Sequence, residues 1–147
     1  MFLGLYQNAL LAAFGSKLRF EPSSVESPTL NIGGAAYRVL APIMNRDTAA
    51  AMLTENVRVG FFHGPTLLAG YDGSGYVALE TTSLENVVWL AKTTSDSVLV
   101  ETDPTYPPYA HSTGQKGPFV MAAAETVGTN KVVATGEAIF TDYKNMI

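Results

Sequence analysis

The sequence contains no cysteine, so disulfide bonds, thiolate metal ligands and a cysteine nucleophile are all excluded. It has only two histidines, His63 and His111, which excludes a three-histidine metal site. Charged residues make up 15% of the chain, against about 25% in an average globular protein. Nine basic and 13 acidic residues give a net charge of −4, so we expect no nucleic-acid partner, because such binding depends on a basic surface.

The chain also lacks a hydrophobic run of the roughly 20 residues that span a bilayer. Residues 2–14 form the most apolar stretch near the start, but Gly4, Gln7 and Asn8 interrupt it. This stretch has no basic n-region either, so it is not typical of a signal peptide. The 147 residues are 47% hydrophobic, which is enough to bury the core of one domain. We therefore expect residues 1–147 to be a single globular domain with no membrane span.

Hydrophobic periodicity predicts one leading helix followed by short strands. In residues 2–14, apolar side chains recur at spacings of three and four, which places Tyr6, Leu10 and Phe14 on one stripe. Asp47 is a plausible N-cap for a short helical turn. This turn is predicted at 48–53, and strands are predicted at 17–21, 37–40, 57–62, 76–79, 87–91, 97–101, 119–126 and 131–135.

Proline, glycine and serine mark the connections between these elements. Residues 22–28 are predicted to be a loop, and Asp72 with Gly73 indicates a tight turn. The spacing of four residues at 93–96 is typical of a hairpin between the strands on either side. The closing residues 136–143 are predicted to turn into a short helix. Such an inventory has too few crossover helices for a freestanding doubly wound fold.

Four passages of the chain follow one another in a distinctive order. The first is an apolar helix that passes through Gly15 into a short strand, and the second is a strand closed by His63, Gly64 and Pro65. The third is the run Val-Val-Trp-Leu-Ala-Lys-Thr-Thr. The fourth combines a Gly-Pro turn, an apolar strand, a glycine turn and the run Val-Val-Ala-Thr-Gly-Glu. In this order they resemble the later portion of class I glutamine-amidotransferase-like domains, of the gliding-motility and intraflagellar-transport type, in archaeal and bacterial surface proteins.

The resemblance implies an α/β or α+β fold, in which a mixed sheet with few helices forms part of a flavodoxin-like three-layer domain. The opening nucleotide-fold half of the family has no counterpart here, so the resemblance implies that the chain is the later part of a larger domain. It departs from the family at Glu137 and Ala138, where the family often has Asp and Ser. The resemblance also favours an extracytoplasmic or cell-surface location.

Glutamine amidotransferases use a cysteine nucleophile, which this chain lacks. We therefore expect a non-catalytic amidotransferase-like module that serves in binding or assembly and holds no cofactor. The proline- and tyrosine-rich loop 103–117 is the predicted contact surface, through Tyr106, Tyr109 and His111, for a protein or glycan partner. His63 is a further predicted binding residue outside this loop. These aromatic residues could equally cover the core of the domain itself.

Two alternatives to the binding module remain open. The first is a hydrolase or metal-dependent enzyme that uses His63, His111 and nearby carboxylates. Glu101 and Asp103 are weak candidates for a metal site, because carboxylates at a strand end are usually only solvated, and no recognised metal motif is present. His63 could instead simply fix its turn. The second alternative is a structural fragment that associates, as a homo-oligomer, through an exposed sheet edge.

Overall fold

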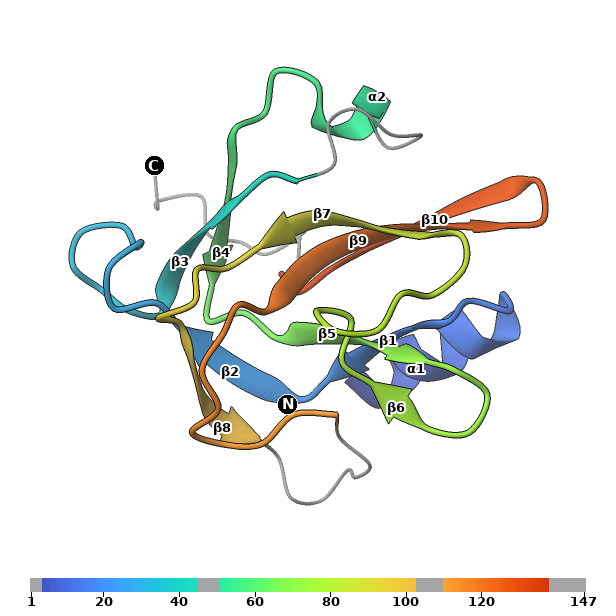
Figure 1. The fold of residues 1–147 in the computed structure, drawn as a ribbon, viewed down its shortest axis with the longest axis horizontal. Helices are drawn as coiled ribbons and strands as arrows, with labels where there is room; N and C mark the ends of the chain where they lie inside the picture. The colour runs from blue at the N-terminus through green and yellow to red at the C-terminus, as the bar shows by residue number, and fades with distance from the viewer. Residues whose placement is uncertain (1–3, 45–50, 103–109, 138–147) are drawn as a thin grey trace.

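The computed structural model describes residues 4–44, 51–102 and 110–137 (Figure 1). In this part of the chain there are two helices and ten strands. The helices are α1 (Gly4–Ala13) and α2 (Ala51–Thr54). The strands are β1 (Leu18–Glu21), β2 (Ser23–Glu26), β3 (Arg38–Pro42), β4 (Val59–His63), β5 (Leu67–Tyr71), β6 (Tyr76–Val77), β7 (Val87–Lys92), β8 (Val98–Thr102), β9 (Val120–Val127) and β10 (Asn130–Thr135).

The strands form four small sheets, and every strand pair described is antiparallel. Two sheets have three strands, in the orders β1-β5-β6 and β10-β9-β7, and two are the pairs β2-β8 and β3-β4. The predicted fold class is therefore wrong: the domain is mostly antiparallel β, not a flavodoxin-like three-layer α/β fold. Antiparallel neighbours need no crossover helix, which agrees with the shortage of helices in the sequence.

Most strands lie where the sequence predicts them, but one pairing prediction and one loop prediction are wrong. The predicted strands at 87–91 and 97–101 do not pair as a hairpin, because β7 pairs with β9 and β8 pairs with β2. Residues 23–26 were expected in a loop and form β2. This strand is bordered by Pro22 and Pro28, and serine and proline near a strand obscure its signal. The closing segment 138–143 lies outside the described residues.

The hydrophobic core consists of two clusters that share the strands β5 and β9. Neighbouring residues of each strand point into different clusters, since Leu67 belongs to one and Leu68 to the other, as do Met121 and Val120. All four of these side chains are fully buried. Both faces of β5 and β9 are therefore covered, which explains why these strands read as continuous apolar runs.

The helix α1 lies where it was predicted but presents its apolar stripe to solvent. Tyr6, Leu10 and Phe14 are 85%, 57% and 63% exposed. The inward side of the helix instead carries Leu11, which is buried, and Asn8, whose amide bonds the backbone of Phe20 in β1. The two hydrogen bonds between Asn8 and Phe20 therefore determine which side of α1 faces β1. The predicted apolar stripe faces solvent instead. Neither α1 nor α2, the helices of the described ranges, has the length and hydrophobicity to cross a membrane.

Gly136 fixes the point where the chain leaves β10 and meets the start of β5. Its carbonyl accepts a hydrogen bond from the N–H of Thr66 at 3.0 Å, and its own N–H donates to Met121 at 2.7 Å. A Cβ atom at this position would lie 1.8 Å from the carbonyl oxygen of Thr66. The backbone therefore admits no side chain here without moving.

We predict that Gly136→Ala lowers the free energy of unfolding by roughly 1–3 kcal/mol, because the two backbone segments must separate. Urea unfolding followed by circular dichroism measures the change. Gly75→Ala is the matched control, since a Cβ there meets nothing within 4 Å, and its effect should stay within about 0.5 kcal/mol. Equal effects of the two substitutions would contradict the close approach at Gly136.

Candidate functional site

A buried histidine between two carboxylates is the strongest polar cluster of the described structure. The Nδ1 atom of His111 lies 2.6 Å from Oε2 of Glu21, and its Nε2 atom lies 3.0 Å from Oε2 of Glu80. The side chains of His111 and Glu21 are each 1% exposed and that of Glu80 is 9% exposed. The ring also packs edge-on against Phe119, with 5.7 Å between ring centroids. We call these three residues the Glu21–His111–Glu80 cluster.

Each carboxylate of the cluster is also bonded to backbone. Glu21, on β1, accepts from the N–H of Ala110, and Glu80 accepts from the N–H of Val120, at 2.5 Å, where β9 begins. The cluster therefore joins β1, the turn that follows β6, the segment before Ser112 and the first residue of β9. A neutral imidazole has a single N–H, so both of its bonds to carboxylates are made only when the ring is protonated.

The environment of His111 raises the pKa of its imidazole from 6.5 to about 9. Burial acts in the opposite direction and is the largest single influence, because it penalises the charged ring. The hydrogen bonds to Glu21 and Glu80, together with their negative charges, outweigh that penalty. At neutral pH the cluster therefore holds one imidazolium between two carboxyl groups.

The geometry suits a structural link better than a metal centre. The two nitrogens of an imidazole point away from each other, so Glu21 and Glu80 lie on opposite sides of the ring and cannot share one ion with it. Within the described ranges, no three histidine, aspartate or glutamate side chains converge to hold a metal ion. Glu101 is exposed on β8, and its predicted companion Asp103 lies outside the described residues.

His63, the second predicted histidine, lies at the end of β4 in a different environment. Its ring packs edge-on against Tyr37, with 5.2 Å between ring centroids, and against Phe61, with 6.5 Å. Its backbone N–H donates to the carboxylate of Glu137. Among the described residues, His63 contacts Tyr37, Phe61 and Glu137, and none of them is a described partner of the His111 ring. The structure thus does not bring the two histidines into one site.

The outer edge of β4 has few hydrogen-bond partners among the described residues. The N–H of Ile43 donates to the carbonyl of Arg58, and the N–H of Gly64 donates to the carbonyl of Tyr37. These two bonds show which opposed residues of the β3-β4 pair are hydrogen-bonded to each other. Because bonding alternates along an antiparallel pair, Val59, Phe61 and His63 direct their N–H and C=O groups away from β3. In the described structure only the N–H of His63 finds a partner there, namely Glu137. The outward backbone groups of Val59 and Phe61 have none among the described residues.

Most other edges are covered by the rest of the chain. The side chain of Asn8 bonds both backbone groups of Phe20 on β1, and residues 30–35 bond the outer edge of β3. Residues 114–117 cover β8, and Met44 bonds Leu90 on β7. Figure 1 shows β3 and β4 side by side as a ribbon that leads toward α2, and among the described strands β4 pairs with β3 alone.

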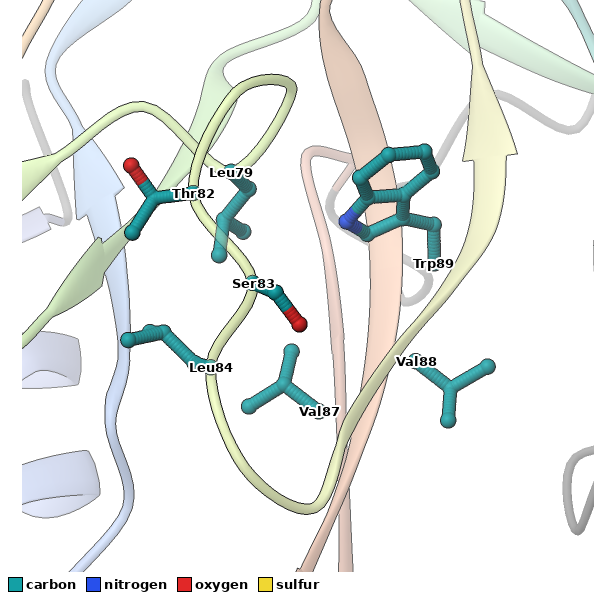
Figure 2. Close-up of a pocket in the computed structure, with 7 residues that line it drawn as sticks. All are labelled: Leu79, Thr82, Ser83, Leu84, Val87, Val88 and Trp89. Atoms are coloured by element: carbon teal, nitrogen blue, oxygen red, sulfur yellow. The ribbon is translucent and has the colours of Figure 1, made fainter.

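A shallow pocket of about 300 Å³ lies between β7 and the segment before it. Figure 2 shows the indole of Trp89 and the side chains of Leu84 and Val87 around this hollow, while Val88 points away from the segment at Leu79. The hydroxyl groups of Thr82 and Ser83 add the polar atoms, and no lining residue is titratable. The pocket offers contact area but no acid, base or nucleophile of high reactivity.

Of the predicted site residues, the structure describes His63, Glu101 and His111, and the contacts described for them do not join any two. Tyr106 and Tyr109 lie outside the described residues, so the predicted contact surface on loop 103–117 stays a prediction. His111, the third member of that surface, is buried and bonded on both sides. Glu21 and Glu80 were missed, because nothing in the sequence indicates that a strand glutamate and a turn glutamate meet a histidine 90 residues away from the first.

No family model, curated protein or solved structure matches this chain. The resemblance to amidotransferase-like domains therefore stays a prediction, apart from its fold class, which the structure contradicts.

We predict that stability falls as pH rises from about 6.5 to about 9, because His111 binds its proton more tightly when folded. A raised pKa contributes stability below the unfolded value and loses it as pH passes through the folded value. The upward shift corresponds to roughly 3 kcal/mol at most. Urea unfolding at a series of pH values between 6 and 10 measures this decline.

The variant His111→Gln keeps hydrogen-bonding capacity but cannot carry the charge. It should lose roughly 3–5 kcal/mol at pH 6, because two buried carboxyl groups are left facing each other without a cation, and its stability should change little between pH 7 and 9. His63→Gln is the control and should retain the decline of the unmodified chain. An unchanged pH profile in His111→Gln would show that another group is responsible.

Proposed function

We propose that this domain is an assembly module that binds an extended protein segment by adding it as a strand to the outer edge of β4. The observation that supports this most directly is the open backbone of Val59 and Phe61, whose side chains are also 45% and 40% exposed. Unpaired N–H and C=O groups in a row are a template for another strand. Exposed apolar side chains beside them add the hydrophobic contact that strand addition requires.

The composition of β4 favours binding rather than protection. Proteins usually protect an exposed edge with lysine, proline or a bulge, and the run Val-Gly-Phe-Phe-His has none of these. Valine and phenylalanine also have high strand propensity. On the same face, the half-buried side chains of Leu40 and Pro42 extend the apolar surface across the ribbon. An incoming segment would therefore find both backbone partners and an apolar platform.

The edge of β10 is the natural comparison, because it is also open within the described part of the chain. The β9-β10 register directs the backbone groups of Lys131 and Val133 away from β9. Lys131 lies at this edge, and Val133, at 48% exposure, is the single large exposed apolar residue of β10. A charged lysine disfavours strand addition, so β4 is the better binding edge of the two.

This proposal develops one of the alternatives that the sequence left open, association through an exposed sheet edge. Binding through loop 103–117 stays a separate prediction. A hydrolase that combines His63 with His111 gains no support from the described residues, because the contacts described for the two rings do not overlap.

We predict that Phe61→Pro weakens strand addition at least about tenfold, or ~1.4 kcal/mol. Proline removes the outward N–H, and it leaves the β3-β4 hydrogen bonds in place because the N–H of Phe61 does not face β3. The probe is a fluorescein-labelled peptide of alternating threonine and valine with lysine at each end, followed by fluorescence anisotropy. Phe61→Thr retains the N–H and separates the loss of the ring from the loss of the donor.

Val133→Pro is the matched control, since it removes an outward N–H from the edge of β10. It should leave peptide binding unchanged. The proposal is wrong if the peptide does not bind the unmodified chain, or if Val133→Pro weakens binding as much as Phe61→Pro does.

A further inference from the structure

We propose that the strand added to β4 is the β4 strand of a second copy of this chain, paired antiparallel about a two-fold axis at Gly60. This inference rests on the proposed function, because it uses the same open edge, and it specifies the partner and the register. A two-fold interface requires a surface that is complementary to itself. The edge of β4 meets this requirement through its backbone, its apolar side chains and its charges.

The backbone of β4 is self-complementary in one register. When Val59 lies opposite Phe61 of the partner subunit, Phe61 also lies opposite the partner's Val59. Each of these pairs can exchange two N–H···O bonds, as mutually bonded pairs do in an antiparallel sheet. All the outward groups of Val59 and Phe61 that lack partners among the described residues would then be satisfied. The two ribbons would become one four-stranded sheet.

The side chains of the same pairs meet on one face of that sheet. Residues directly opposite each other in an antiparallel pair share a face, and their Cβ atoms lie about 4.5–5.5 Å apart. Phe61 would therefore cover the partner's Val59, and the reverse. Aromatic and β-branched residues are a favourable cross-strand combination, and at present both side chains are exposed. Gly60, at the centre of the pairing, has no side chain to oppose its own copy.

Charge complementarity favours the same register. The carboxylate of Glu137 sits on the outer edge of β4, bonded to the backbone N–H of His63. In this pairing, the partner's His63 lies opposite Val57, so the partner's Glu137 comes beside Arg58. Arg58 is exposed and forms no ion pair within the described structure. The two-fold axis would create this arginine–carboxylate contact twice.

The surroundings of Glu137 disfavour its charged form, so a nearby cation would stabilise the carboxylate. Burial raises its pKa, and the hydrogen bond from His63 and the charge of that residue offset this only in part. A guanidinium that arrives from a second copy would favour the charged carboxylate. Glu137 also limits the length of the pairing, because it occupies the N–H of His63. The dimer is therefore short and concentration-dependent rather than permanent.

Sedimentation velocity of the full 147-residue chain, over a range of concentrations, tests the proposal. Arg58→Glu and Glu137→Arg should each raise the dimer dissociation constant about tenfold, because each places like charges together at both contacts. The double variant restores opposite charges and should recover dimerisation. Glu137→Gln retains a hydrogen-bond acceptor for His63 and should weaken the dimer less. Lys131→Glu is the control, a charge reversal at the other open edge, and should have no effect.

Several results would overturn the inference and remain distinguishable from failure of the proposed function. A chain that stays monomeric but binds the threonine–valine peptide rejects the second copy as partner and retains strand addition. A dimer that Phe61→Pro disrupts but charge reversal does not affect rejects the register. A dimer weakened by Lys131→Glu assigns the contact to β10. A chain that neither dimerises nor binds the peptide rejects both proposals.

Discussion

The need to cover strand edges governs the architecture of this small domain. Four sheets of two or three strands have many outer strands for their size, and each outer backbone group must find a partner or face water. Asn8 on α1 forms hydrogen bonds with the edge of β1, and loop residues form hydrogen bonds with the edges of β3 and β8. Among the described residues, the backbone groups of Val59 and Phe61 at the edge of β4 find no partner, and their side chains are apolar. Its proposed role in assembly follows from that contrast between covered edges and one that is exposed and apolar.

The Glu21–His111–Glu80 cluster performs a different task, because it holds segments together that share no sheet. It connects β1 with the turn after β6 and with the start of β9 through one protonated ring. Buried ion clusters contribute little net stability compared with apolar packing, but removing one member leaves the others uncompensated. The cluster therefore specifies how the β1-β5-β6 sheet lies against the β10-β9-β7 sheet. We assign it to the scaffold, and the candidate site to the surface of the β3-β4 ribbon.

The sequence predicts local structure here much better than it predicts pairing or sites. Alternating apolar residues predict β1 and β4, since successive side chains of a strand point to opposite faces. Pairing between β2 and β8 joins residues far apart in the chain, and no local pattern encodes it. Val59 and Phe61 share one face of β4, at the position of the predicted strand 57–62, and both of these apolar side chains are exposed. Whether an apolar face packs inward or awaits a partner depends on the tertiary fold, so the sequence alone could not identify the edge of β4 as a site.

Amide hydrogen exchange at Val59 and Phe61, measured at increasing chain concentration, tests the central claim most directly. These two amides point away from β3, so in the monomer they should exchange rapidly, whereas those of Gly60 and Phe62 should be protected. Assembly through β4 should make the protection of Val59 and Phe61 rise with concentration, while that of Lys131 and Val133 stays low. Rapid exchange of Val59 and Phe61 at every concentration, with protection appearing on β10 instead, would contradict it.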